Sequence, residues 1–116
     1  MREAKRDKER LLNILEACNI LLERSGSDTI ESLRDDPIRF YGYVKLVEII
    51  GEATYKLTKE FRQEHPVAPW DMMEGMRHIL VHDYYRISET QLWTTLSVDI
   101  PNLKPIIDML IKDYDE

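Results

Sequence analysis

The sequence contains few of the residues that break helices. Its 116 residues include four glycines and five prolines. No stretch alternates apolar and polar residues over the length of a β-strand, so strands are not expected. Several segments instead carry apolar residues at every third or fourth position, which is the spacing of an amphipathic helix. We therefore predict an all-α fold for residues 1–116, a single domain built as an up-down bundle of four to five helices.

Cysteine and long apolar runs are also scarce, and each absence excludes a class of protein. The one cysteine, Cys18, cannot form an internal disulfide or a cysteine-rich metal site. No run approaches the roughly 20 apolar residues of a membrane span. The charged start, "MREAKRDKER", lacks the apolar stretch of a signal peptide. We expect a cytoplasmic protein that does not enter a membrane.

An excess of basic charge is missing as well. The formal net charge is −6. Non-specific affinity for nucleic acid comes mainly from Lys and Arg that neutralise phosphates. A broad basic face that coats RNA is therefore not expected, and any contact with RNA must use a local site.

Five segments are predicted to be helical, and a short turn is possible in "DTIESLRDD". They cover about residues 3–24, 37–59 and 69–84, a fourth begins at about 88, and a last one begins at Pro101. Asp36 followed by Pro37 is typical of an N-cap and a first helical residue. Gly51, inside the second segment, costs about 1 kcal/mol against alanine. It indicates a close approach by another backbone, either of this chain or of a second copy.

The stretch "GMRHILVHDYYRI", residues 75–87, carries the most chemistry. As a helix, this stretch and the turn before it have one apolar side that is expected in the core, formed by Met72, Met73, Met76, Ile79 and Leu80. On the other side lie Arg77, His78, His82 and Tyr85. Arginine matches phosphate oxygens with a planar fork of donors, and histidine exchanges protons near neutral pH. Such a set suits cleavage of a phosphodiester whose nucleophile is the 2′-OH of RNA, a reaction that needs no metal and no cofactor.

Other interpretations of the stretch are weaker or less specific. His78 and His82 are four residues apart and resemble half of a zinc site, but "HILVH" is not the zincin pattern and no third ligand stands out. Cys18 lies on an apolar stripe and is a poor candidate nucleophile. Spacing alone favours an ordinary solvated helix face over a catalytic one.

A resemblance across much of the chain changes that balance. "RHILVHDY" resembles the Arg-x4-His-x-Tyr motif of HepT-like toxins in the HEPN superfamily. "EIIGEA" resembles the family's second-helix signature, and "HPVAPW" followed by "GMR" resembles the approach to its catalytic helix. "LWTTLSVDIPNLKPIIDML" resembles its C-terminal end. Together these four blocks span about residues 38–112.

The resemblance implies a HEPN-like homodimer in which the motifs of two protomers face a shared cleft. It implies a metal-independent endoribonuclease without a cofactor, the toxin of a toxin–antitoxin pair that cleaves RNA such as tRNA. The partner implied is an MNT-type nucleotidyltransferase antitoxin. In such pairs the antitoxin can transfer AMP to the motif tyrosine, which is Tyr84 here.

Each motif residue receives a role from this resemblance. His82 is the expected general acid and base, and Arg77 the phosphate clamp. His78 either orients substrate or merely borders the cleft. Asp83 either orients His82 or is a solvated charge at a helix end. Glu52 either lines the cleft or pairs with Arg77, unless it is a plain polar helix position.

Two further expectations complete the sequence reading. Trp70 and Trp93 are expected in the core.

A non-catalytic function is the alternative: HEPN-like bundles can serve as nucleotide-binding or protein-interaction modules that partner a nucleotidyltransferase. The net charge of −6 favours this alternative slightly, and the intact Arg77, His82 and Tyr84 set favours the enzyme.

Overall fold

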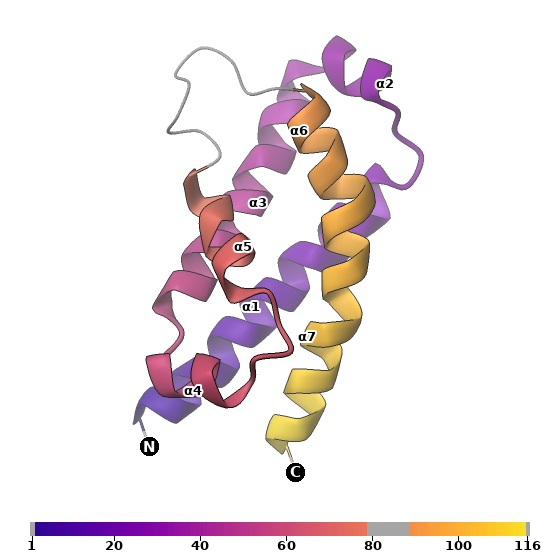
Figure 1. Cartoon of the computed structure of the whole chain (residues 1–116). Helices are drawn as coiled ribbons and strands as arrows, with labels where there is room; N and C mark the ends of the chain where they lie inside the picture. The colour runs from indigo at the N-terminus through magenta and orange to yellow at the C-terminus, as the bar shows by residue number, and fades with distance from the viewer. Residues whose placement is uncertain (1, 79–88, 116) are drawn as a thin grey trace.

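The computed structural model describes residues 2–78 and 89–115, and all the regular structure in these ranges is helical (Figure 1). The first part of the chain forms α1 (Arg2–Ser25), α2 (Ile30–Asp35), α3 (Pro37–Lys56) and α4 (Lys59–Glu64). The second part forms α5 (Trp70–Gly75), the 3₁₀ turn η1 (Met76–His78), α6 (Glu89–Thr94), the π-helical segment η2 (Thr95–Asp99) and α7 (Ile100–Asp115).

The helices run up and down along one long axis. The molecule measures 46 × 27 × 20 Å. Helix α1 packs against both α3 and α7, and α5 with η1 packs against α3. Figure 1 shows α1 rising from the N-terminus, α3 returning beside it, and α6, η2 and α7 descending to the C-terminus at the same end of the molecule. The all-α up-down bundle predicted from the sequence is confirmed.

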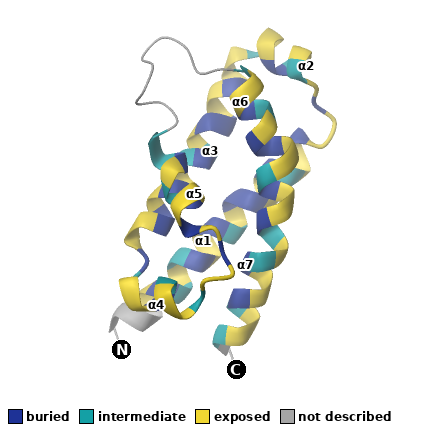
Figure 2. Cartoon of the chain, viewed as in Figure 1, coloured by how far each residue is buried: buried dark blue, intermediate teal, exposed yellow. Residues whose placement is uncertain are grey.

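The predicted apolar stripes form the core. Fully buried side chains alternate with exposed ones so that each long helix has an inner and an outer face (Figure 2). Leu11, Ile14, Cys18 and Leu21 of α1 are completely buried, as are Val47 and Ile50 of α3 and Ile107 of α7. Within residues 2–78 and 89–115, no helix combines the length and the apolar character needed to cross a membrane.

The beginnings of α2 and α3 follow local capping rules. The Asp36 carboxylate accepts a hydrogen bond from the Arg39 backbone N–H at 3.1 Å, and Pro37 opens α3 as predicted. The short turn considered possible in "DTIESLRDD" is α2. Thr29 and Ser32 cap it reciprocally, each side chain accepting from the backbone N–H of the other.

A buried carboxylate in the loop between α1 and α2 connects α2 and α3. Asp28 accepts hydrogen bonds from the Tyr43 hydroxyl at 2.6 Å, the Arg39 guanidinium at 2.8 Å and the Ser32 hydroxyl at 2.9 Å. Burial alone would raise the pKa of Asp28, but these donors outweigh it and lower the pKa. Burial and the hydrogen bond to Asp28 raise the pKa of Tyr43 to about 12. The cluster therefore fixes one end of the bundle around an ionised aspartate and a protonated phenol.

Helix α3 ends three residues earlier than predicted, at Lys56 instead of about Lys59. The reason is a contact with α1 that spacing along the sequence does not reveal. The Asp7 carboxylate accepts from the Thr58 backbone N–H at 2.9 Å and from its hydroxyl at 2.6 Å. Thr58 then caps α4 by accepting from the Phe61 N–H. The chain breaks there because Thr58 bonds to α1 rather than to the preceding turn of α3.

The last helix was predicted to begin at Pro101, and α7 begins one residue earlier, at Ile100. It follows α6 and η2 directly, so residues 89–115 form one continuous helical path. Proline lacks an N–H and its ring crowds the carbonyl four residues earlier, which here belongs to Ser97. The wider π turn of η2 lies at this point, and the Ile100 N–H reaches back five residues to Thr95. The helix absorbs Pro101 by widening instead of ending.

Candidate functional site

Trp70 anchors the helix that leads to the motif. It opens α5, is buried, and its indole N–H donates to the carbonyls of His65 at 2.8 Å and Arg62 at 3.1 Å. Its ring meets Phe61 edge-on, with centroids 6.0 Å apart. Trp70 therefore lies in the core as predicted. The other tryptophan, Trp93, is half-buried and packs against the core.

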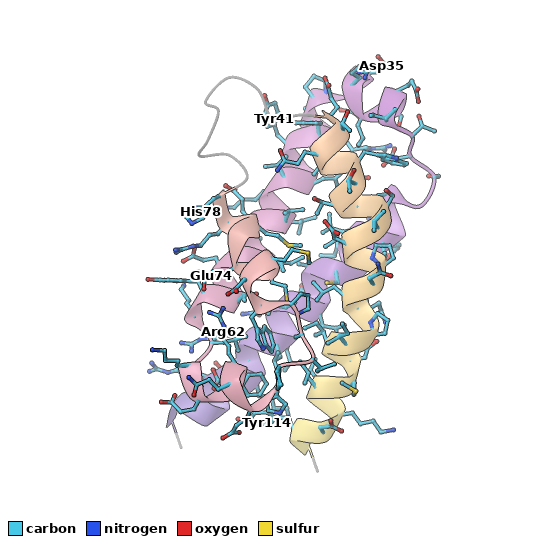
Figure 3. The ribbon with its side chains drawn as sticks, in the orientation of Figure 1. Asp35, Tyr41, Arg62, Glu74, His78 and Tyr114 are labelled. Atoms are coloured by element: carbon cyan, nitrogen blue, oxygen red, sulfur yellow. The ribbon has the colours of Figure 1, made fainter. Side chains whose placement is uncertain are left out.

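An ion pair ties α5 to α4. Arg62 contacts the Glu74 carboxylate at 2.7 Å and Asp71 at 3.5 Å. Figure 3 shows Arg62, Glu74 and His78 following one another along the same side of the molecule. The indole hydrogen bonds and this pair hold α5 at both its start and its last turn, which sets where η1 begins.

The helix predicted over residues 69–84 begins at Trp70 and narrows into a 3₁₀ turn at Met76–His78. The residues that follow, 79–84, lie outside the described part of the chain. Met73 and Met76 are buried as predicted, but the expectation for Met72 was wrong because 40% of it is exposed. Helix α5 packs mainly on α3, and Met72 lies on its outer side, against a surface hollow.

Gly51 of α3 allows the backbone of η1 to lie directly on the helix. A Cβ atom at position 51 would come 2.1 Å from the Arg77 nitrogen and 2.8 Å from its Cα. Contacts under 3 Å are not sterically possible, so only glycine admits this packing. The close approach predicted from the mid-helix glycine is confirmed, and the approaching backbone belongs to the same chain.

The Arg77 side chain lies over the ring of Tyr55. Its Cζ atom is 3.7 Å from the ring centroid, within cation–π range. Tyr55 is half-exposed, and Arg77 is half-buried. The Arg77 Nε atom is buried and has no hydrogen-bond partner among residues 2–78 and 89–115. Within this part of the chain, the guanidinium group is thus held by packing on an aromatic face.

Tyr55 also lines a surface hollow of about 770 Å³ between the end of α3, α4 and α5. Cationic Lys59 and Arg62 and anionic Asp71 and Glu74 share this lining. Sequence reasoning missed Tyr55. The available signal was its position four residues after Gly51, which places both on one face of α3.

Glu52 and His78 are the other two predicted site residues that the structure describes. Glu52 is exposed and lines a separate groove between α1 and α3 with Arg10 and Lys56. The structure describes both Glu52 and Arg77 and records no ion pair between them. His78 is half-buried, next to Arg77 at the end of η1. Its part in substrate orientation stays a prediction.

His82, Asp83 and Tyr84 lie outside the described residues. Their predicted roles as acid–base group, orienting group and modification site therefore stay predictions. The structure instead shows how the first motif residue, Arg77, is fixed in place.

Cys18 is confirmed as a core residue. Its side chain is completely buried, and burial raises the pKa of the thiol to about 12, with a smaller opposing effect from Lys104. A thiol with so high a pKa is almost wholly protonated near neutral pH and is a poor nucleophile.

Comparison with known proteins places the chain in a family. The family model described as "Ribonuclease HepT-like" matches residues 14–110. A "Putative RNase" of Caldanaerobacter subterraneus subsp. tengcongensis is 38% identical over 104 residues, which cover 89% of this chain and 93% of the relative.

Two further relatives that match most of the chain are also named as ribonucleases. A "Putative RNase" of Methanocaldococcus jannaschii is 36% identical over 92% of this chain and 99% of its own length. The "Probable ribonuclease HepT" of Thermococcus cleftensis is 33% identical over 90% of this chain and 96% of its own length. No solved structure matches the chain. The matched region includes Gly51, Tyr55, Arg77 and His82, and the chain belongs to the HepT-like ribonuclease family.

Proposed function

We propose that this protein is a metal-independent endoribonuclease that uses Arg77 and His82. The observation that carries the proposal is the double anchoring of Arg77, by its backbone on Gly51 and by its side chain on Tyr55. A guanidinium group held in one place by such packing presents a planar fork of donors that matches the oxygens of an anionic ligand such as a phosphodiester.

The chemistry needs only these side chains and the RNA. The 2′-oxygen forms a bond to phosphorus, and the bond from phosphorus to the 5′-oxygen breaks. A neutral histidine takes the 2′-OH proton, a protonated histidine gives one to the departing 5′-oxygen, and the products are a 2′,3′-cyclic phosphate and a 5′-OH. Arg77 stabilises the charge that grows on the phosphoryl oxygens in the transition state.

A homodimer would supply two copies of His82, one to take the 2′-OH proton and one to give a proton to the 5′-oxygen. One protomer carries a single His82, whereas a shared cleft would hold two, one as base and one as acid. A local cleft also agrees with the net charge of −6, because two copies of Arg77 concentrate positive charge at one point. We propose that two protomers place their motifs in one cleft.

Membership of the HepT-like ribonuclease family supports a proposal about the partner and the target of this protein. We propose that the protein is the toxin of a HEPN/MNT pair, acts in the cytoplasm on RNA such as tRNA, and is neutralised by an MNT-type nucleotidyltransferase. Transfer of AMP to Tyr84 would place a bulky anion beside the motif and block RNA.

The test compares wild type with His82→Ala in growing cells and with purified protein. Wild type expressed alone should arrest growth and damage tRNA on a gel, and the purified protein should cleave RNA with a chelator present. His82→Ala should lose these effects. His65→Gln, which changes a histidine stacked on Phe61 away from the motif, is the matched control and should retain them.

The control for a negative result is mass spectrometry, which must show that Tyr84 is unmodified. If folded, unmodified wild type leaves RNA intact, the proposed ribonuclease activity is wrong. That result would favour a nucleotide-binding or protein-interaction module that partners a nucleotidyltransferase. The observation behind this second candidate is the acidic net charge. Binding of the nucleotidyltransferase without RNA cleavage would establish it.

A further inference from the structure

Tyr55 has no role in the proposed chemistry, yet its ring lies directly against the guanidinium group of Arg77. The guanidinium carbon lies 3.7 Å from the centre of the ring. Tyr55 is 51% exposed, so the contact adds little to the core. An exposed aromatic ring that covers an arginine of the proposed site calls for an explanation other than stability.

The pair completes a two-point support for Arg77. Gly51 fixes the Arg77 backbone against α3, and Tyr55, one helical turn later on the same face, fixes the far end of the side chain. A free arginine samples many rotamers, and each must be given up when it binds phosphate. A side chain already held at both ends gives up fewer of them.

Stacking on the ring leaves the arginine free to bind an anion. Contact at the guanidinium carbon occupies a face of the group, whereas its N–H donors lie in the plane. The same tyrosine is 51% exposed and lines the hollow between α3, α4 and α5, so part of its ring faces solvent. Because the ring covers a face of the guanidinium group and not its edge, phosphate can meet the in-plane donors while the ring stays in place.

We propose that Tyr55 is the positioning residue of Arg77, a flat aromatic support that holds the guanidinium group ready for a phosphate of the RNA. This inference rests on the proposed ribonuclease function and assigns a residue to its phosphate clamp. The aromatic face is what matters, and the phenol hydroxyl is dispensable.

The experiment compares Tyr55→Phe, which keeps the ring, with Tyr55→Leu, which removes it. Tyr41→Leu is the matched control, because Tyr41 is 54% exposed on the same helix and lies near the α2 end of the molecule (Figure 3). With an RNA substrate, Tyr55→Leu should lower kcat about 3- to 30-fold, with a smaller change in KM. Tyr55→Phe and Tyr41→Leu should stay within about twofold of wild type.

A second measurement does not depend on catalysis. The ring current of Tyr55 should shift the NMR resonance of the Arg77 Nε–H proton upfield. Tyr55→Leu should remove this shift, and Tyr55→Phe should keep it. Thermal unfolding of all variants establishes that each is folded.

The two readouts separate the possible failures. If wild type cleaves no RNA, the proposed function fails, and the NMR shift still decides whether the ring holds Arg77. If wild type cleaves RNA but Tyr55→Leu matches Tyr41→Leu in kcat, the positioning role is wrong. Equal damage from Tyr55→Phe and Tyr55→Leu would also overturn it, because the hydroxyl would then be the active feature.

Discussion

Gly51 and Arg77 are 26 positions apart in the chain, yet the backbone of Arg77 rests on the bare Cα of Gly51. A methyl group at position 51 would approach the Arg77 nitrogen to 2.1 Å. The glycine that weakens α3 as a helix therefore determines where the first motif residue lies. Glycine lowers the helix propensity of α3, and in return its missing side chain lets the Arg77 backbone lie against the helix.

Gly51→Ala should destabilise the protein and displace Arg77. Overpacking costs about 1–3 kcal/mol, partly offset by the better helix propensity of alanine. We expect a net loss of about 1–2 kcal/mol in the free energy of unfolding, measured with urea, and a fall in RNA cleavage of about 10- to 100-fold.

Gly42→Ala is the matched control for that change. Gly42 is in the same helix, and nothing lies within 4 Å of an added Cβ. It should gain about 0.5–1 kcal/mol of stability and leave RNA cleavage unchanged. A Gly51→Ala protein as stable and active as Gly42→Ala would show that η1 does not rest on α3.

Arg77→Lys should behave almost like Arg77→Ala in RNA cleavage, although it keeps the positive charge. Lysine lacks the planar fork that binds two phosphate oxygens and stacks on Tyr55. We expect kcat to fall about 10²- to 10³-fold in both variants. The measurement is single-turnover cleavage at saturating protein, with circular dichroism as the folding control. Full activity of Arg77→Lys would mean that charge alone is used.

Stability in acid should depend on Asp28. The pKa of Asp28 is lowered in the folded state, so its contribution is present above the unfolded value of about 3.9 and is lost as pH falls through the folded pKa. Asp28→Asn should cost about 1–3 kcal/mol near neutral pH, because the buried Tyr43 hydroxyl and the other two donors lose a charged acceptor. The difference from wild type, measured by urea unfolding, should shrink below about pH 4. A difference that stays constant with pH would contradict the ionised cluster.

Stability in alkali should depend on Tyr43. The pKa of its phenol is raised to about 12, above the unfolded value of about 10. The stabilisation is thus complete below about pH 10 and is lost as pH rises toward 12. Tyr43→Phe should be less stable than wild type near neutral pH and should show a smaller alkaline loss between these values. Parallel stability curves for the two proteins would argue against the Tyr43–Asp28 hydrogen bond.

Cys18 should resist alkylation in the folded protein. Its thiol is completely buried, and its pKa is about 12. Iodoacetamide at about pH 8 should modify almost none of it in native buffer and all of it in concentrated guanidinium chloride. Mass spectrometry reads the added mass. Rapid labelling without denaturant would mean that α1 opens far more easily than its packing against α3 and α7 implies.

The sequence predicted well wherever the cause is local. Asp36 and Pro37 start α3 because a carboxylate and a fixed φ act within one turn. The apolar stripes of α1, α3 and α7 predicted which residues are buried, because burial follows the helical period. The motif around Arg77 and the family blocks beside it were also readable, and the family is confirmed.

Predictions failed where a distant residue decides the outcome. Helix α3 ends at Lys56 because Thr58 bonds to Asp7, 51 positions away. Met72 is exposed because it lies on the outer side of α5, which packs mainly on α3. The start of the last helix was predicted to within one residue, but the sequence did not show that the π turn of η2 joins this helix to α6 without a break.

The sequence by itself determined the helical class of this protein, most of its core and the identity of its motif, because periodicity, caps and residue chemistry are written along the chain. Only the tertiary structure decided which backbone approaches Gly51, and only it brought Tyr55 beneath the guanidinium group of Arg77. Both contacts join α3 to residues more than 20 positions later. Such contacts arise from how helices pack, and packing depends on all the faces that meet in the folded chain.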